Sequence, residues 1–292
     1  MEHQLPALSE YYGVEGELSF GFYLGGATAS KAGCFEPYPA SEDIWLPTMS
    51  CIGYYFQPVW DDLQAPCNTG ASQLMSTNGA TAASQGTAAA DGAIAKLVAL
   101  GFQNSIAFLD IEQYNVPSGN TTCSPAVRAY VNAWVAEMHK NSYLAGVYSS
   151  PGNIAADMGP GAVANVPDQV WVALANGVGS TASLPPIPNG SWVYDQRTHQ
   201  YTINYAGPYF PVVSPPIKID LDQLDADTAY WSNIGLVCQG ACTNPCNPGC
   251  PDYAPGDPDC NPGGNCDCYS CTDPEDCPLC CGDVCGIPNC GG

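Results

Sequence analysis

Two carboxylates separated by one residue, Asp110 and Glu112, form the strongest candidate catalytic pair in the sequence. They stand at the end of a predicted strand over 105–111, after an apolar run from Ile106 to Leu109. Side chains at positions i and i+2 of a strand point to the same face, about 7 Å apart along it. Apolar walls and a second carboxylate raise the pKa of a carboxyl group, as a general acid requires. Such pairs are typical of enzymes that break glycosidic bonds.

Further acidic and aromatic residues follow or lie within other predicted strands. If the strands form a barrel, their carboxyl ends meet at one mouth, where the active sites of such barrels lie. Asp220 is a third catalytic candidate there. The substrate-binding candidates are Tyr23, Trp60, Asp61, Tyr114, Tyr148, Trp171, Trp192 and Asp195. The competing interpretation is structural: each aromatic residue can belong to the core, and for Asp61, Asp62 and Asp222 we favour a role as helix caps or loop residues.

The elements that must position these residues alternate between strand and helix. Strands are predicted at 18–24, 53–60, 105–111, 144–149 and 170–174, with helices at about 84–100 and from Ser124 onward. Two more strands, at 191–196 and 217–221, follow with no helix between them. The pattern predicts an α/β domain with a mostly parallel sheet, closed as a TIM-like (β/α)-barrel whose last strands lack full helices.

Charge and composition exclude several classes of partner. The 292 residues include 28 acidic and 6 basic side chains, so the net charge is −22. Binding of nucleic acid or an anionic membrane needs clustered Lys and Arg, which this chain lacks. No apolar run is long enough to span a bilayer. We also expect no cofactor and no metal, because nucleotide-binding glycine motifs are absent and the three histidines are dispersed.

The cysteines divide the chain into two predicted domains, 1–237 and 238–292. Of 17 cysteines, 13 fall in the second segment, which has no basic residue and few large apolar ones. We predict a small, loop-dominated module held by disulfides; zinc and a calcium loop at Asp257, Asp259 and Asn261 are weaker alternatives. Disulfides indicate an extracellular location, although no leader is visible at the start of this sequence.

Several motifs resemble the glycoside-hydrolase-like domain of secreted actinobacterial proteins, a relative of the family 25 lysozymes. They are GFYLGG (21–26), QAPC (64–67), LVALGF (97–102), LDIEQYN (109–115), AVRAYVNAW (126–134), AGVYSS (145–150), WVYDQ (192–196) and IKIDLD (217–222). The resemblance covers roughly 5–225 and implies a (β/α)-barrel acting on a cell-wall or extracellular glycan. By the same resemblance, Glu112 is the general acid, Asp110 positions substrate or stabilises positive charge, and Asp220 completes the acidic floor.

One departure from that family leaves a second function open. In the relatives, a strand carrying an Asp precedes the region of GFYLGG, whereas here only a short segment without Asp precedes Leu18. A barrel without its first strand has open edges, which recruit another strand, so we expect a homo-oligomer or polymer. The alternative to a hydrolase is therefore a catalytically inactive barrel that self-assembles or binds glycan, cross-linked through its cysteine-rich tail.

Overall fold

The computed structural model describes residues 19–28, 46, 50, 54–205, 219–226 and 228–229. The cysteine-rich module predicted at 238–292 and the calcium loop within it lie outside these residues. Within them, the fold is α/β, with one seven-stranded sheet in which the strands follow one another in sequence order. None of the described helices is both long and apolar enough to cross a membrane.

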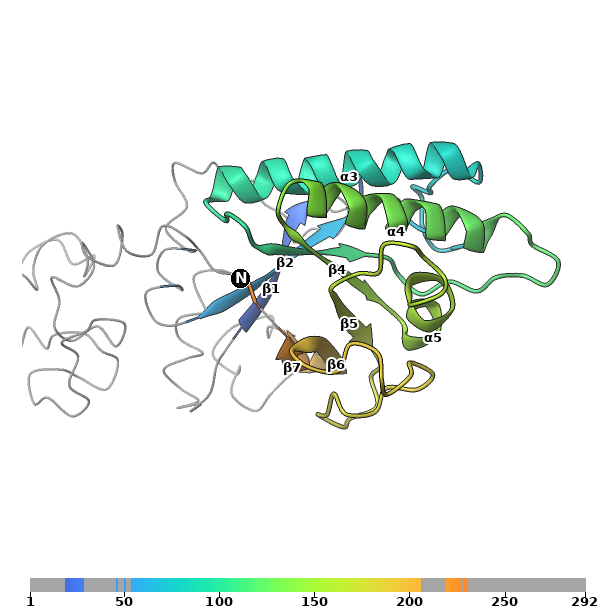
Figure 1. Ribbon diagram of the computed structural model, residues 1–292. Coiled ribbons are helices and arrows are strands. Elements are labelled where there is room, and N and C mark those ends of the chain that lie inside the picture. The colour runs from blue at the N-terminus through green and yellow to red at the C-terminus, as the bar shows by residue number, and fades with distance from the viewer. Residues whose placement is uncertain are drawn as a thin grey trace, which may run out of the picture. The chain divides into compact units, whose positions relative to one another are not determined.

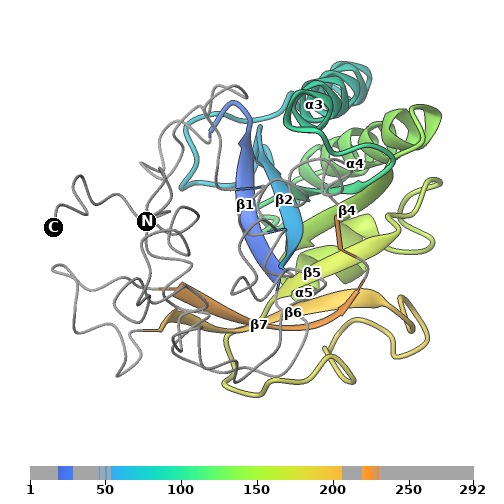
Figure 2. The same cartoon turned by 90° about the vertical axis from the view of Figure 1, so that its left-hand side faces the viewer.

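The sheet is curled into a half-barrel, which Figure 2 shows most clearly. Its strands are β1 (Ser19–Gly25), β2 (Tyr55–Asp61), β3 (Ile106–Asp110), β4 (Leu144–Ser149), β5 (Gln169–Ala173), β6 (Gln196–Tyr205) and β7 (Ile219–Ala226). Strands β2 to β6 run parallel, and β7 pairs antiparallel to β6. Across the interior, Gln57 Nε2 donates to Thr198 Oγ1 at 2.8 Å and so joins β2 to β6. The fold class is thus confirmed as α/β, and full closure of a TIM barrel stays a prediction.

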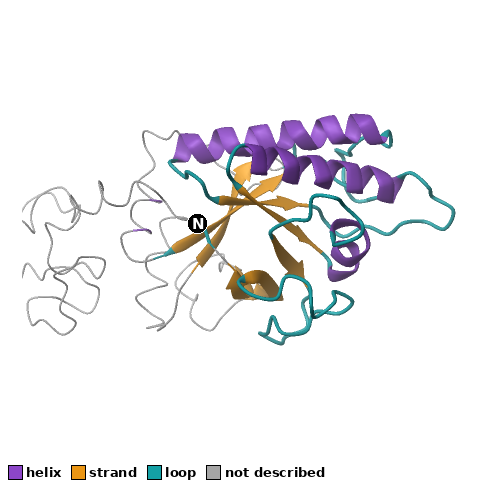
Figure 3. Cartoon of the chain, in the orientation of Figure 1, coloured by secondary structure: helices purple, strands orange, loops and turns teal. Residues whose placement is uncertain are grey.

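Two long helices cover one side of the sheet and lie side by side (Figures 1 and 3). They are α3 (Gly79–Leu100) and α4 (Cys123–Lys140). Asn78 caps α3 by accepting from the N–H groups of Ala80 and Thr81, which compensates helix donors that lack partners. A Cβ atom at Gly86 would overlap the main chain of Tyr130, so glycine permits the close approach of α3 to α4. A short α5 (Pro151–Asn153) runs into a π-helical turn, η3 (Ile154–Met158).

Alternation along the strands separates an outer face, packed on the helices, from an inner face. On β3, the parallel register aligns Phe108 with Gly146 of β4 and Asp110 with Tyr148. Trp171 of β5 fills the interior: its ring contacts those of Phe108 and Tyr148, and a Cβ atom at Gly21 of β1 would overlap it. Because Phe108 and Asp110 share a face, the Asp110 side chain belongs to the interior, at the carboxyl end of the strand.

The strand predicted at 191–196 is wrong, since β6 begins only at Gln196. Residues Trp192 and Asp195 have positive φ values, 53° and 51°, which interrupt an extended chain. The indole of Trp192 is buried, and its Nε1 donates to the Pro167 carbonyl at 2.7 Å. This tertiary contact, not local strand propensity, sets the conformation of the segment.

Candidate active site

Carboxylates from two neighbouring strands meet at the carboxyl end of the sheet. Asp61 ends β2, Asp110 ends β3, and the two are register partners. Burial raises the pKa of Asp61, as does the charge of Asp62, while hydrogen bonds from Thr28 and Gln64 oppose the rise. The parallel register therefore brings two acids to one edge, as expected from their positions after apolar strand segments.

Asp110 is the most buried acid of this group, with 3% of its surface exposed. Its Oδ1 atom is buried and has no hydrogen-bond partner among the described residues. Burial raises its pKa well above the ordinary value, and the charges of Glu112 and Asp61 raise it further. The neutral form of the Asp110 carboxyl is consequently favoured more strongly than in an exposed aspartate.

Glu112 lies two residues beyond Asp110 and, unlike it, is exposed to solvent. Strand β3 ends at Asp110, although the N–H of Ile111 still donates to the Tyr148 carbonyl at 3.0 Å. Partial burial of the carboxyl raises the pKa of Glu112, and the charge of Asp61 adds to this. Of the pair Asp110 and Glu112, Glu112 is therefore the one that a ligand can reach from solvent.

Gln64 clasps the main chain between these two acids, a role that sequence reasoning did not identify. Its Nε2 donates to the Asp110 carbonyl at 3.0 Å, and its Oε1 accepts from the Glu112 N–H at 2.7 Å. Gln64 itself is buried. A side-chain amide bonded to main chain leaves no periodic signal, and only its place in the QAPC motif pointed to this residue.

Replacing Gln64 by Leu should lower the free energy of unfolding by about 2–4 kcal/mol, because two buried main-chain groups each lose a partner. The matched control is Gln85→Leu on α3, where Gln85 accepts a single bond from the Ser76 N–H at 2.8 Å. That control should cost about 1 kcal/mol. Chemical denaturation of both variants measures the difference. Equal losses of unfolding free energy would show that the two Gln64 hydrogen bonds do not stabilise this segment.

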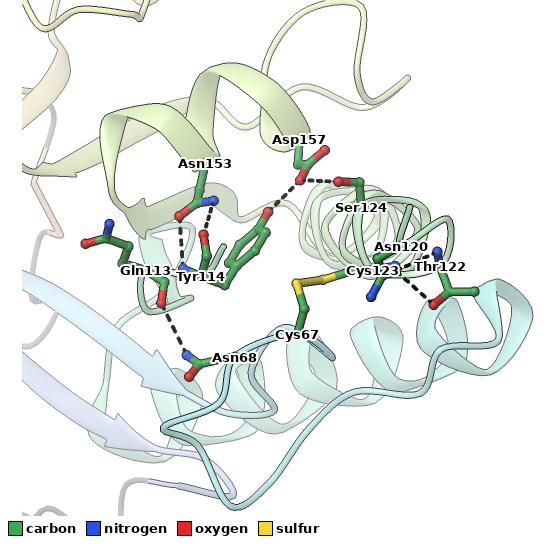
Figure 4. The surroundings of a disulfide bond; sticks show 10 residues. All are labelled: Cys67, Asn68, Gln113, Tyr114, Asn120, Thr122, Cys123, Ser124, Asn153 and Asp157. Carbon is green, nitrogen blue, oxygen red and sulfur yellow. Dashed lines mark hydrogen bonds between the residues drawn. A yellow bond between two sulfur atoms is a disulfide. The ribbon is translucent and has the colours of Figure 1, made fainter. Parts of the chain in front are cut away.

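A second side-chain amide holds the same segment farther along. Asn153 Nδ2 donates to the Tyr114 carbonyl at 3.0 Å, and its Oδ1 accepts from the Tyr114 N–H at 3.2 Å (Figure 4). The Tyr114 hydroxyl donates to the buried Asp157 at 2.7 Å, and Asp157 also pairs with Arg128 at 2.9 Å. The chain that carries Glu112 is thus anchored on both sides.

A disulfide between Cys67 and Cys123 ties the loop after Gln64 to the first residue of α4 (Figure 4). The two cysteines are 56 residues apart in sequence. Cys123 is fully buried. The covalent link fixes the loop that supplies Gln64 against the helix whose start lies beside Asp157.

Two more acids come from β7, on the other side of the mouth. Asp222 accepts a hydrogen bond from Trp171 Nε1 at 2.6 Å. Burial raises the pKa of Asp222 to about 6; the Trp171 bond and His199 oppose this rise, and Asp220 adds to it. Asp222 therefore lies beside Asp220 on β7, and its bond to Trp171 also fits the structural role predicted for it from the sequence.

Tyr148 connects the two sides. Its hydroxyl donates to Gln200 Oε1 at 3.0 Å, and Gln200 Nε2 donates to Asp220 Oδ2 at 3.1 Å. Burial raises the pKa of Tyr148, and so do the charges of Glu112, Asp110, Tyr23 and Asp220. Glu112, Asp110, Tyr23 and Asp220 therefore all interact electrostatically with the Tyr148 hydroxyl. We call the set Asp61, Asp110, Glu112, Asp220 and Asp222 the acidic mouth.

The other predicted binding residues divide between the mouth and the scaffold. Tyr23 lies near Tyr148, and Trp171 forms the floor beneath it. Trp60 instead donates to Asp62 at 3.2 Å, and it lies against Gly92 of α3. Tyr114 and Trp192 are buried in the contacts given above, and Asp195 lies in the loop before β6. The described contacts do not bring these last four residues to the acids.

Within the described ranges, no group of three or more His, Cys, Asp or Glu side chains could hold a metal ion.

A family model described as "Rv2525c-like, glycoside hydrolase-like domain" matches residues 15–223. Among solved structures, an uncharacterized B. stearothermophilus protein is similar over 71% of this chain and 84% of its own, with 20% identity and a TM-score of 0.44. The Clostridium perfringens spore cortex lytic enzyme SleM is similar over 69% of this chain and 59% of its own, with 15% identity and a TM-score of 0.42. No curated protein matches the chain. The family match spans β1 to β6 and the first part of β7.

Proposed function

The chain belongs to the Rv2525c-like family of glycoside hydrolase-like domains, and we propose that it hydrolyses glycosidic bonds in a cell-wall or extracellular glycan. The observation that carries the proposal is the pairing of a buried Asp110 with a solvent-accessible Glu112 at the carboxyl end of the sheet. Glycoside hydrolysis typically uses two carboxyl groups whose different environments give them different pKa values.

The environments of the two carboxyls support a division of roles. Glu112, which is exposed and has a raised pKa, is placed to donate a proton to the oxygen of the leaving group. Asp110 is less exposed than Glu112, and its unpartnered Oδ1 is placed to accept a hydrogen bond from a substrate hydroxyl or, when ionised, to stabilise positive charge that develops on the sugar ring. Asp220 and Asp222 extend the same negative potential across the mouth.

The proposal includes an extracellular location. The disulfide Cys67–Cys123 supports it, because such bonds persist in oxidising compartments.

The wild-type protein should release reducing ends from peptidoglycan or a soluble β-glycan, and it should do so best at acidic pH. The pKa of Glu112 is raised, so its acid form persists above the ordinary range of a glutamate and is lost as the pH rises through that pKa. We therefore expect kcat/KM to fall with rising pH on the alkaline side. Reducing-end assays over a pH series, made in H₂¹⁸O so that mass spectrometry identifies hydrolysis, measure both points. Absence of products from every glycan would remove the hydrolase proposal.

A second candidate function is glycan binding or self-assembly without turnover. Trp171 packs between β1, β3 and β5 in the interior of the sheet. Such packing stabilises the fold whether or not the protein is an enzyme. Binding of a glycan without cleavage, or assembly seen by electron microscopy of the purified protein, would favour this function over the first.

A further inference from the structure

Among the described residues, the acids of the mouth form no salt bridge. The described salt bridges join Arg128 to Asp157, His139 to Asp168 and Lys140 to Glu137. The buried Arg197 bonds the main-chain carbonyls of three loop residues instead. His199 lowers the pKa of Asp222, while neighbouring acids raise the pKa values of Asp61, Asp110 and Glu112. The described acids therefore repel one another with no ion pair of their own.

A buried atom within the mouth also lacks a partner. No described residue forms a hydrogen bond to Oδ1 of Asp110, although only 3% of this residue's surface is exposed to solvent. Asp110 shares the inner face of β3 with Phe108, whose ring contacts Trp171, so its carboxyl belongs to the interior of the half-barrel. An unsatisfied buried acceptor destabilises the protein, and a bound hydrogen-bond donor would remove that cost.

A single metal ion does not fit this need, because no described group of three ligands surrounds one point. A larger organic cation does. Sugar chains that carry free amino groups present ammonium donors along their length, and charge-assisted bonds from ammonium to carboxylate are among the stronger hydrogen bonds. The net charge of −22 would also attract such chains over distance and repel anionic ones.

We propose that the acidic mouth selects glycans with free, protonated amino groups, such as de-N-acetylated hexosamine chains, over N-acetylated or anionic glycans. This inference rests on the proposed glycan function and names its substrate class. Ammonium groups on successive sugars would each lie beside a different acid of the mouth, such as Asp110 or Asp222, while the sugar rings remain open to Glu112. N-acetylation removes the positive charge and so removes the preference.

The test compares the β-1,4-linked tetramers of glucosamine and N-acetylglucosamine by calorimetry at mildly acidic pH. The protein carries Glu112→Gln so that neither tetramer is cleaved. We expect roughly tenfold tighter binding of the glucosamine tetramer, the effect of two or three partly solvated ion pairs. Added salt should reduce the advantage. Because a nearby cation favours ionised carboxyls, binding should release protons, which titrations in two buffers of different ionisation enthalpy would detect.

Asp222→Asn should reduce the preference severalfold, while the matched Asp91→Asn on the outer helix α3 should leave it unchanged. Equal affinities, a preference that salt does not weaken, or binding of neither tetramer would overturn the inference. The two proposals fail separately: a wild-type protein that prefers the amine but cleaves nothing loses only the hydrolase function. One that cleaves N-acetylated chains without preference loses only the selectivity.

Discussion

Glu112→Gln should lower the kcat for glycan cleavage by about 10²–10⁴-fold, the usual contribution of a general acid. Glutamine keeps the size of the side chain and can still accept a hydrogen bond, but it has no proton to donate to the leaving oxygen. The KM should change little, because the residue acts mainly in the transition state. Initial rates of reducing-end release from the same glycan, with wild type and variant at equal concentration, give the ratio.

The matched control for this substitution is Glu137→Gln on α4. Glu137 pairs with Lys140 at 2.7 Å near the C-terminal end of α4 and is not part of the acidic mouth, so the same chemical change there should leave kcat within a factor of about two. Both variants should unfold at nearly the wild-type denaturant concentration. A Glu112→Gln protein that keeps more than a tenth of the wild-type kcat would remove Glu112 from the acid role.

Removal of the disulfide should have the largest effect on stability. Cys67→Ala combined with Cys123→Ala releases a link between residues 56 positions apart, and the entropy gained by the unfolded chain corresponds to about 4 kcal/mol. The loop that supplies Gln64 would also lose its anchor on α4. Urea denaturation of the double variant and the wild type, both under non-reducing conditions, measures the difference.

Thr69→Ala provides the control, since Thr69 is exposed in the same loop and its loss should change stability by no more than about 0.5 kcal/mol. A reductant added to the wild type should reproduce the loss caused by the double substitution. A double variant as stable as the wild type would show that this disulfide does not constrain the unfolded chain.

The elements that the sequence predicted well are those with a local cause. The strand predicted at 105–111 and the helix predicted from Ser124 onward follow from apolar periodicity, and they are found at 106–110 and 123–140. Pro125 lies in the first turn of that helix as predicted, but its N-cap is Thr122 and not Ser124. The segment at 191–196 failed for the opposite reason. Its apolar residues resemble a strand, but the burial of Trp192 against Pro167 and two left-handed residues determine its path.

The site shows the same division. Asp110 and Glu112 were recognisable because an apolar run precedes two acids. Gln64 was not, because its function depends on main-chain atoms 46 and 48 positions away in sequence. Asp222 resembled any other acid after a strand, and only the Trp171 bond across the interior distinguishes it. Contacts between distant segments carry no local signal, so the structure was needed to find them.

The central claim is that a glycan is cleaved at the acidic mouth, and a crystal structure of the Glu112→Gln protein with a bound oligosaccharide tests it most directly. We predict a glycosidic oxygen within about 3 Å of the substituted side chain, the distance that proton transfer requires. The neighbouring sugar should lie against Asp110 and Tyr148. A saccharide bound away from the carboxyl end of the sheet, or a side chain at position 112 directed away from the bound sugar, would contradict the account.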